Sequence, residues 1–375
     1  GQMQLVKSGA GLMSLTGDLN YSGGTVVNGG TLRLAQAVAF PTAGSTGQFG
    51  SPHTVTVNNG GTLQLNSDWV MGDGLANQVV VNGGTLQFLN SDNYLGNIVL
   101  DEGTITTSGG LRPWRTGNFG NGLITVNNTG AGSSNISGSL AFVGTAAAPM
   151  TTFNVADGAA VNDLIMSSMI FDHPGFEGDM QFVKTGDGTM VLSGNSTFTG
   201  GVLIQQGTLQ LGLGGTSGSL AAANTITLGD AGTGASDVAF LVNRSDANTV
   251  ANNIVVSALG TGTATIGSNS TAGGPFGTIF SGTINLNRPT TMQGTDPDRT
   301  TYTNVISGNV GTLTVNGGGR TTWEANNTFV GDVVITGAGT VLQVGVAGNQ
   351  IPDASNVDVG AGTTLQLNND SETIN

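Results

Sequence analysis

The stretch YSGGTVVNGGTLRL, residues 21–34, decides the fold, because nearly the same sequence returns twice further along the chain. It recurs as FTGGVLIQQGTLQL at 198–211 and, more loosely, as FVGDVVITGAGTVLQV at 329–344. Recurrence of one pattern indicates repeated supersecondary units, each of which buries its apolar face by stacking on its neighbours. The first question is therefore what one unit looks like.

A shorter unit lies inside this stretch and returns at closer intervals. Its matching threonines are Thr31, Thr62, Thr85 and Thr104, which gives spacings of 31, 23 and 19 residues. The first interval contains the extra stretch FPTAGSTGQFGSP, residues 40–52, which we interpret as an inserted loop. The four copies are TVVNGGTLRL (25–34), TVTVNNGGTLQL (54–65), VVVNGGTLQF (79–88) and NIVLDEGTITT (97–107).

Two β architectures fit the short unit. Apolar residues alternate in it, as at Val55, Val57, Leu63 and Leu65, which is typical of half-buried strands. Asn-Gly between alternating runs favours a hairpin and therefore an antiparallel sandwich. A period near 20 residues with a glycine-rich corner favours a β-solenoid instead. Because the similarity lies one interval away rather than one strand away, we predict a solenoid, with Leu stacked on Leu and Asn on Asn.

Composition supports an ordered core and excludes several function classes. The chain has 375 residues, 64 of them glycine, with 9% charged residues and a net charge of 9 − 23 = −14. Without a basic patch it is not expected to bind nucleic acid or anionic membranes. No apolar run approaches the ~20 residues of a membrane helix, so we expect no membrane insertion. The absence of cysteine excludes disulfides, thiolate metal sites and a cysteine nucleophile.

Longer cassettes overlie the short units. Residues 5–34, LVKSGAGLMSLTGDLNYSGGTVVNGGTLRL, match residues 182–211, FVKTGDGTMVLSGNSTFTGGVLIQQGTLQL, and residues 313–344 form a looser third copy. These motifs resemble the autotransporter-associated β-strand repeat, also called the passenger-associated transport repeat. Residues that fit its pattern include Lys7, Gly9, Gly30 and Lys184, together with Gly207 and the neighbouring threonine and leucine.

The resemblance implies an all-β, right-handed parallel β-helix on a bacterial outer surface or outside the cell. We expect residues 1–375 to form one continuous solenoid, with cassettes starting near 5, 182 and 313 and with inserted surface loops. At about 22 residues a coil, the chain makes about 16–17 coils. We expect the recurring Tyr21 and Phe198 to lie in the core.

The two ends of the chain raise a question of assembly. GQMQ at 1–4 is similar to GDMQ at 178–181, and SETIN at the end is similar to a segment that leads into such a strand. Two alternatives follow: the chain is a window of a longer array, or copies stack end to end through uncapped edge strands. Expected partners are therefore copies of the chain or flanking repeats. The predicted contact residues are Gln2, Met3, Gln4, Leu5, Glu372, Thr373 and Ile374.

The two histidines are weak candidates for chemistry. His173 lies in FDHPGFEGD, residues 171–179, beside Asp172, Glu177 and Asp179, which suggests a metal or acid–base cluster; a slightly long coil loop is the simpler interpretation. His53 precedes a strand in a turn, where we expect a solvated side chain.

Acidic loops give equally weak signals. Asp230 and Asp237 could bind calcium in GDAGTGASD, residues 229–237, although a solvated loop explains them as well. The same holds for Asp296, Asp298 and Arg299 in TDPDRT as a carboxylate pair of a glycan-cleaving enzyme. Motifs of serine hydrolases, P-loops and zinc proteases are absent. We therefore predict no enzyme activity, no catalytic residue, no cofactor and no metal.

The segment GGLRPWRTGNFG, residues 109–120, has the most unusual composition and is interpreted as an inserted loop. Arg112, Trp114 and Arg115 bring two of nine basic residues and one of three tryptophans together. Trp and Arg are favoured at binding hot spots, so these residues are candidates for contact with surface glycans or a neighbouring copy. A tryptophan that covers the side of the solenoid is the alternative.

Together these observations predict a non-enzymatic extracellular solenoid that acts as a stalk, fibre or adhesive surface. A glycan-binding or glycan-cleaving β-helix is the alternative function, for which a row of surface aromatics would be expected.

Overall fold

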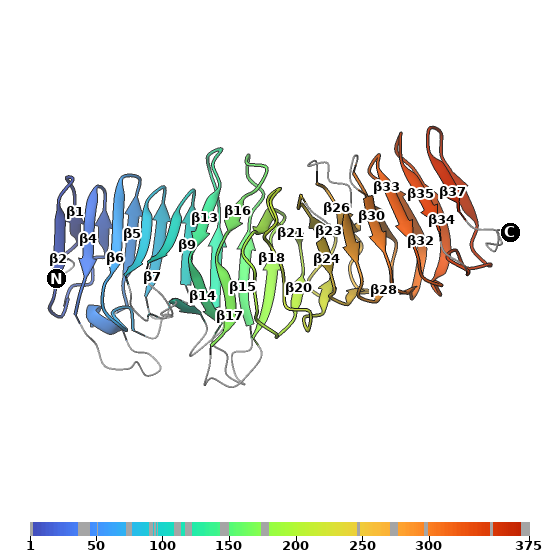
Figure 1. The fold of residues 1–375 in the computed structure, drawn as a ribbon. Helices are drawn as coiled ribbons and strands as arrows, with labels where there is room; N and C mark the ends of the chain where they lie inside the picture. The colour runs from blue at the N-terminus through green and yellow to red at the C-terminus, as the bar shows by residue number, and fades with distance from the viewer. Residues whose placement is uncertain are drawn as a thin grey trace. The chain divides into compact units, whose positions relative to one another are not determined.

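The fold is a right-handed parallel β-helix, seen in a computed structural model of the chain (Figure 1). Its residues divide into two compact units, Gly1–Met190 with Gly194–Gly200, and Val191–Ser193 with Gly201–Asn375. The structure describes residues 3–36, 46–50, 52–72, 77–89, 93, 95, 97–108, 114–116, 122–142, 150–173, 180–245, 248–270, 277–295, 299–345 and 348–368.

The first unit has three sheets and one short 3₁₀ helix, η1 (Gly47–Phe49). Its first sheet contains, in spatial order, β1 (Leu5–Lys7), β3 (Thr25–Val27), β5 (Thr54–Asn58), β7 (Gln78–Asn82), β9 (Asn97–Asp101), β12 (Gly122–Val126), β15 (Met150–Val155) and β18 (Gln181–Thr185). Its second contains β2 (Leu12–Leu15), β4 (Gly30–Leu34), β6 (Gly61–Leu65), β8 (Thr85–Leu89), β10 (Thr104–Ser108), β13 (Ser134–Ser137), β16 (Leu164–Met166) and the first two residues of β19 (Thr189–Leu192), whose last two belong to the second unit. Its third contains β11 (Trp114–Thr116), β14 (Ser139–Phe142) and β17 (Met169–Asp172).

The second unit also has three sheets. Its first contains β20 (Val202–Ile204), β22 (Ile226–Leu228), β25 (Ile254–Val256), β28 (Ile284–Leu286) and β31 (Ile306–Ser307). Its second contains β21 (Gly207–Leu211), β23 (Val238–Val242), β26 (Ala264–Ser268), β29 (Thr290–Gln293), β32 (Asn309–Asn316), β34 (Val330–Ile335) and β36 (Val357–Val359). Its third contains β24 (Asn248–Val250), β27 (Thr278–Phe280), β30 (Arg299–Tyr302), β33 (Arg320–Trp323), β35 (Val341–Val344) and β37 (Thr364–Leu367).

The strands pair as a solenoid requires and not as a sandwich requires. Each strand bonds to the equivalent strand one coil away, and the named pairs of the described residues are parallel, as in β4 with β6, where Thr31 faces Thr62. The alternative architecture, with antiparallel hairpins between consecutive strands, is therefore wrong. The strands from β2 to β36 that form the second sheets of the two units number 15 in the described residues, one for each coil. This number is close to the 16–17 coils predicted.

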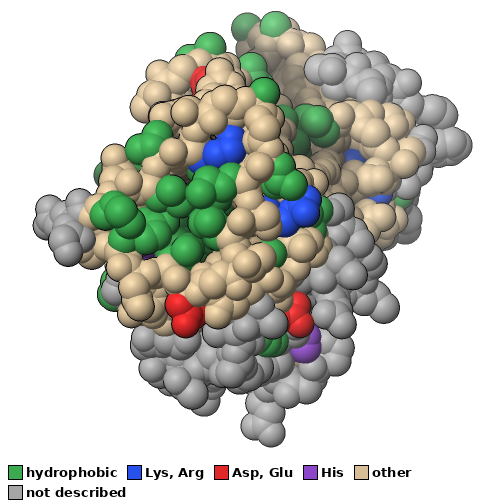
Figure 2. Space-filling model, turned by 90° about the vertical axis from the view of Figure 1, so that its left-hand side faces the viewer, with side chains coloured by type: hydrophobic (Ala, Val, Ile, Leu, Met, Phe, Trp, Pro, Cys, Tyr) green, Lys and Arg blue, Asp and Glu red, His purple; other side chains and the backbone are tan. Residues whose placement is uncertain are grey.

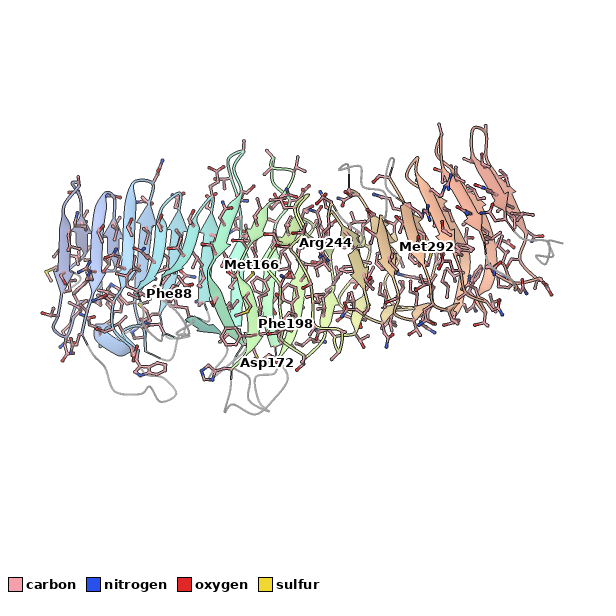
Figure 3. The ribbon with its side chains drawn as sticks, viewed as in Figure 1. Phe88, Met166, Asp172, Phe198, Arg244 and Met292 are labelled. Atoms are coloured by element: carbon pink, nitrogen blue, oxygen red, sulfur yellow. The ribbon has the colours of Figure 1, made fainter. Side chains whose placement is uncertain are left out.

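In-register pairing stacks like side chains into columns. Leu32, Leu63, Leu86 and Ile105 occupy equivalent positions of β4, β6, β8 and β10, and all four are buried. Each of these residues covers the side chain above or below it and excludes water from it. A single coil is too small to form a core of its own, and stacking provides one. Tyr21 and Phe198 are buried, which confirms the predicted core positions. Phe88 and Met292 are further buried residues of the two units (Figure 3).

The asparagine of the NGG corner forms the predicted ladder of Asn on Asn. Asn58 Nδ2 donates to Asn28 Oδ1 over 2.7 Å, and Asn82 Nδ2 donates to Asn58 Oδ1 over 3.3 Å. The Asn58 amide thus serves as a donor to the preceding coil and an acceptor from the following one. These bonds hold the corner of each coil above the corner of the last.

Glycine at the same corner is required by both backbone conformation and space. Gly30 has φ +61°, in the left-handed region, and a Cβ there would collide with the Gly9 carbonyl oxygen of the preceding coil. Gly11 is different, since a Cβ there meets nothing within 4 Å. The motif therefore contains both obligatory and tolerant glycines.

Two buried lysines close glycine corners from the inside of the coil. The ammonium Nζ of Lys7 donates to the carbonyl oxygens of Ser8, Gly9 and Gly29 at 3.2, 2.7 and 2.8 Å. Lys184, which is fully buried, donates to Thr185 O at 3.0 Å and Gly186 O at 2.6 Å. An ammonium has three donors and no acceptor, so it suits a turn that presents several carbonyls. This contact explains why Lys precedes Ser/Thr-Gly in both cassettes.

Burial changes the acidity of Lys184. Desolvation lowers the pKa of Lys184 from 10.5 to about 7, although Asp187 and Asp163 favour the charged form. In the unfolded chain the same amine keeps its proton up to a pH near 10.4. Between about pH 7 and 10 the unfolded state therefore binds more protons, and the free energy of unfolding rises with pH.

We predict that Lys184→Met removes this pH dependence. The wild-type free energy of unfolding should gain up to about 1.4 kcal/mol per pH unit over the variant between pH 7.5 and 10. Urea unfolding of both proteins at several pH values measures the difference, in which the other lysines and tyrosines cancel. Parallel curves for the two proteins would contradict the assignment.

We predict that Gly30→Ala destabilises the first unit by about 1–3 kcal/mol, because alanine is strained at this φ and collides with the neighbouring coil. Gly11→Ala, at a corner of the same cassette with open space, should change stability by less than about 1 kcal/mol. Thermal and urea unfolding of the two variants make the comparison. Equal effects at both positions would show that the close approach of the coils is not limiting.

Candidate functional site

The described residues contain no group of three or more His, Cys, Asp or Glu side chains that could hold a metal ion. Within the same residues, no helix has the length and apolar character needed to cross a membrane.

The segment 109–120 was predicted to be an inserted loop, but part of it forms a strand. Residues Trp114–Thr116 form β11, which pairs in parallel with β14, so that Trp114 is opposite Leu140 and Arg115 is opposite Ala141. The segment thus starts the third sheet of the first unit. Arg112 lies outside the described residues. The binding role of Arg112, Trp114 and Arg115 stays a prediction.

His53 is buried, and the prediction of a solvated histidine was wrong. Only 4% of its surface is exposed, its ring stacks on Phe49 with centroids 4.3 Å apart, and Nε2 is 2.8 Å from Thr25 Oγ1. Thr25 Oγ1 is in turn 2.7 Å from the hydroxyl of Tyr21. The inserted loop supplies η1 and Phe49, which cover the ring. Burial lowers the pKa of His53 from 6.5, partly offset by a backbone contact to Tyr21.

The other acidic and histidine candidates serve local structure or are not described. Asp172, at the end of β17 (Figure 3), accepts the amide and hydroxyl of Thr199 through Oδ2, at 2.9 and 2.8 Å. His173 follows it and is half-buried. Glu177, Asp179, Asp296 and Asp298 lie outside the described residues, and Arg299 starts β30 with an exposed side chain.

The proposed calcium loop is held together by its own hydrogen bonds. Asp230 Oδ1 accepts the amide of Gly232 at 2.7 Å and the amide nitrogen of Gln205 at 2.9 Å. Asp237 Oδ1 accepts the amide of Thr263 at 2.7 Å. The two carboxylates thus bind different protein donors, and calcium at this loop stays a prediction.

A face of open coil lies at the N-terminal edge of the first unit. Met13 and Leu15 of β2 are half-buried, whereas their partners one coil on, Leu32 and Leu34, are buried. Met3, Val6 and Leu12 are 64%, 50% and 56% exposed. Hydrophobic side chains gather on this face in Figure 2. Of the predicted contact residues, Met3, Gln4 and Leu5 belong to this edge, and Gln2, Glu372, Thr373 and Ile374 lie outside the described residues.

A polar hollow of about 520 Å³ follows the asparagine ladder of the first unit. Its lining includes Asn28, Asn58 and Asn82, with Asp101 and Glu102 at the end of the row. Both carboxylate oxygens of Asp101 accept hydrogen bonds from Thr129, one from its amide at 2.7 Å and one from its hydroxyl at 2.8 Å. The hollow thus offers amide groups in a row.

A second hollow, of about 480 Å³, lies in the second unit over β26, β29 and β32. Arg288 borders it and is 6% exposed. Burial lowers the pKa of the Arg288 guanidinium, while Asp237 favours its charged form. The remaining lining is mainly threonine. The sequence analysis did not identify Arg288. The available signal was the alternation of the strand: Arg288 lies two residues before Thr290 and four before Met292, both of which point inward and are buried.

We predict that His53 destabilises the first unit as the pH falls. Because its folded pKa lies below the unfolded value of about 6.5, the unfolded state binds more protons below that pH, and stability decreases there. His53→Gln keeps a hydrogen-bonding side chain without this titration, so its stability should fall less between pH 7 and 5.5. Urea midpoints of both proteins over this range give the comparison; an equal fall in both would rule out His53 as the cause.

Comparison with known proteins agrees with the fold. The family model described as Passenger-associated-transport-repeat matches residues 5–34 and 182–211. The chain is 27% identical over 241 residues to the "Adhesin BmaC autotransporter" of Brucella suis biovar 1 (strain 1330), over 54% of this chain and 7% of that protein. The chain thus spans a small part of that relative's length. No solved structure gives a significant match. The chain thus carries two segments that match the passenger-associated transport repeat, on a parallel β-helix, and is similar over part of its length to an autotransporter adhesin.

Proposed function

We propose that the chain works outside the cell, or on the outer surface of a bacterium, as a non-enzymatic adhesive or structural β-helix. The observation that supports this most is the occurrence of passenger-associated repeats on coils stacked in register. The similarity to a protein named as an adhesin supports the adhesive part of the proposal. Its mechanism is mechanical: axial hydrogen bonds and buried columns keep outward side chains at fixed spacing.

The adhesive role is tested with the purified chain coupled to beads. Beads that carry the folded chain should bind to cell or matrix surfaces at least several-fold more than beads that carry the same chain unfolded and blocked. Equal capture by both would oppose adhesion and leave a purely structural role. Measurement of new reducing ends after incubation with a polysaccharide panel tests the enzymatic alternative, and their release would replace the proposal with a glycan-cleaving function.

Stacking of copies, or of flanking repeats, on the open coil is the second part of the proposal. Its support is the half-exposed inward positions Met13 and Leu15, whose equivalents in the next coil are buried, together with strand edges that carry unpaired backbone groups. The occupant that suits such a surface is another coil with the same apolar columns.

We predict that Met13→Lys with Leu15→Lys abolishes end-to-end association of the chain. An ammonium in the column faces apolar side chains of the incoming coil and cannot be solvated there. Ser14→Lys, on the outward face of the same strand, is the matched control and should associate as wild type does. Electron microscopy and sedimentation over a concentration range give the readout. Monomers in all three proteins would overturn self-stacking and favour flanking repeats as the partner.

A further inference from the structure

The hollow over β26, β29 and β32 is bordered by a buried cation, Arg288, two of whose nitrogens have no partner among the described residues. Arg288 Nη1 donates to Gly262 O at 3.2 Å, while Nε and Nη2 have no hydrogen-bond partner in the described part of the chain. These two nitrogens lie on the same edge of a guanidinium, the edge that binds a carboxylate with two parallel hydrogen bonds. A buried donor without a partner is costly and rare, so the pair needs an explanation.

The backbone around Arg288 is shaped to hold the guanidinium in place. A Cβ at Gly260 would lie 2.7 Å from Nη1, and a Cβ at Gly229 would lie 3.3 Å from Nη2. Both glycines have positive φ, +93° and +84°. The corners of two successive coils therefore leave room for this side chain. Asp237 acts on Arg288 through its charge, and its Oδ1 accepts a hydrogen bond from the amide of Thr263 at 2.7 Å.

The floor of the hollow suits a sugar ring. Its lining includes Thr263, Thr291, Thr312 and Thr314, beside Pro289. Thr291 and Thr314 are in register on neighbouring strands, one coil apart. Threonine offers a methyl group to the apolar face of a pyranose and a hydroxyl to its OH groups. A volume of about 480 Å³ lies within the range of small-molecule sites.

We infer that this hollow binds an acidic saccharide, whose carboxylate pairs with Nε and Nη2 of Arg288 and whose ring lies on the threonines. Because both nitrogens are buried, the guanidinium must shift toward the carboxylate when the saccharide binds. The chain's net charge of −14 repels anions in general, so affinity for an anionic sugar must come from a local site such as this one. The inference rests on the proposed adhesive function and gives it a ligand class.

The test is titration of the whole chain with D-glucuronate, followed by NMR or calorimetry, with D-glucose and acetate as matched probes. Glucose has the ring without the carboxylate, and acetate has the carboxylate without the ring. We expect glucuronate to bind at least tenfold more tightly than either. Arg288→Lys keeps the charge but loses the two-nitrogen edge, and should weaken glucuronate binding at least tenfold.

Two further variants keep the test independent of folding. Thr291→Val preserves shape and should weaken binding several-fold, whereas Arg320→Lys, at the exposed first residue of β33, should leave it unchanged. No binding of glucuronate to the wild type, or equal binding by glucose, would overturn the inference, as would full retention of binding in Arg288→Lys.

The outcome is separable from that of the adhesive proposal. If the beads adhere and glucuronate neither binds nor competes, adhesion stands and the Arg288 site is wrong. If glucuronate binds with the expected variant effects but the beads adhere to nothing, the site stands and adhesion is wrong.

Discussion

Backbone hydrogen bonding between successive coils is the interaction on which the rest of this structure depends. Since the described strands inside the stack pair with their equivalents one coil away on both sides, their backbone groups are satisfied by neighbours of the same conformation. This arrangement requires corners that follow one another closely, and a side chain at Gly30 would collide with the corner before it. Glycine at such close corners is thus required by the spacing between coils.

The same constraint explains how the few charges are used. A corner turns several carbonyl groups toward the inside of the coil, where water does not reach them. Lys7 and Lys184 supply donors at such corners, and Arg288 supplies one at another. These three cations are buried because they complete the backbone, and the net charge of −14 reflects the excess of acidic residues over basic ones. Arg288 differs from the two lysines in having donors left over.

Much of the fold followed from the sequence because its periodicity is strong. The Thr-Leu pairs and the corner asparagines predicted which residues would stack, and Thr31 with Thr62 and Asn28 with Asn58 do so. The cassette was a poorer guide to the sheets. LVK of the first copy forms β1 of a first sheet, whereas LTVN of the third copy belongs to β32 of a second sheet. The sequence of a strand specifies which side chains point inward and where the chain turns. The same pattern can therefore form a strand in any sheet of the β-helix that has the same width.

The site residues were harder to predict because they depend on insertions. His53 was expected in solvent since its own turn looks exposed, but the preceding inserted loop brings Phe49 over the ring. Trp114 lies in a segment without repeat pattern, and its strand forms only because β14 offers an edge to it. Arg288 has no motif around it. For Trp114 and Arg288 the deciding partners come from another coil, at a distance in sequence that no local pattern encodes, whereas the partner of His53 is supplied by the insertion directly before it.

Register has a consequence for what the outer surface can measure. The outward threonines Thr265, Thr291 and Thr314 occupy equivalent positions on three neighbouring strands, so they are separated by the strand spacing of about 4.8 Å. The backbone fixes the spacing of such a row, and the side chains determine what each position can contact. A substitution therefore changes one contact without changing the spacing. A polymer whose own repeat matches a multiple of this spacing would contact several positions of the row at once, and a polymer with a different repeat would contact only one or two.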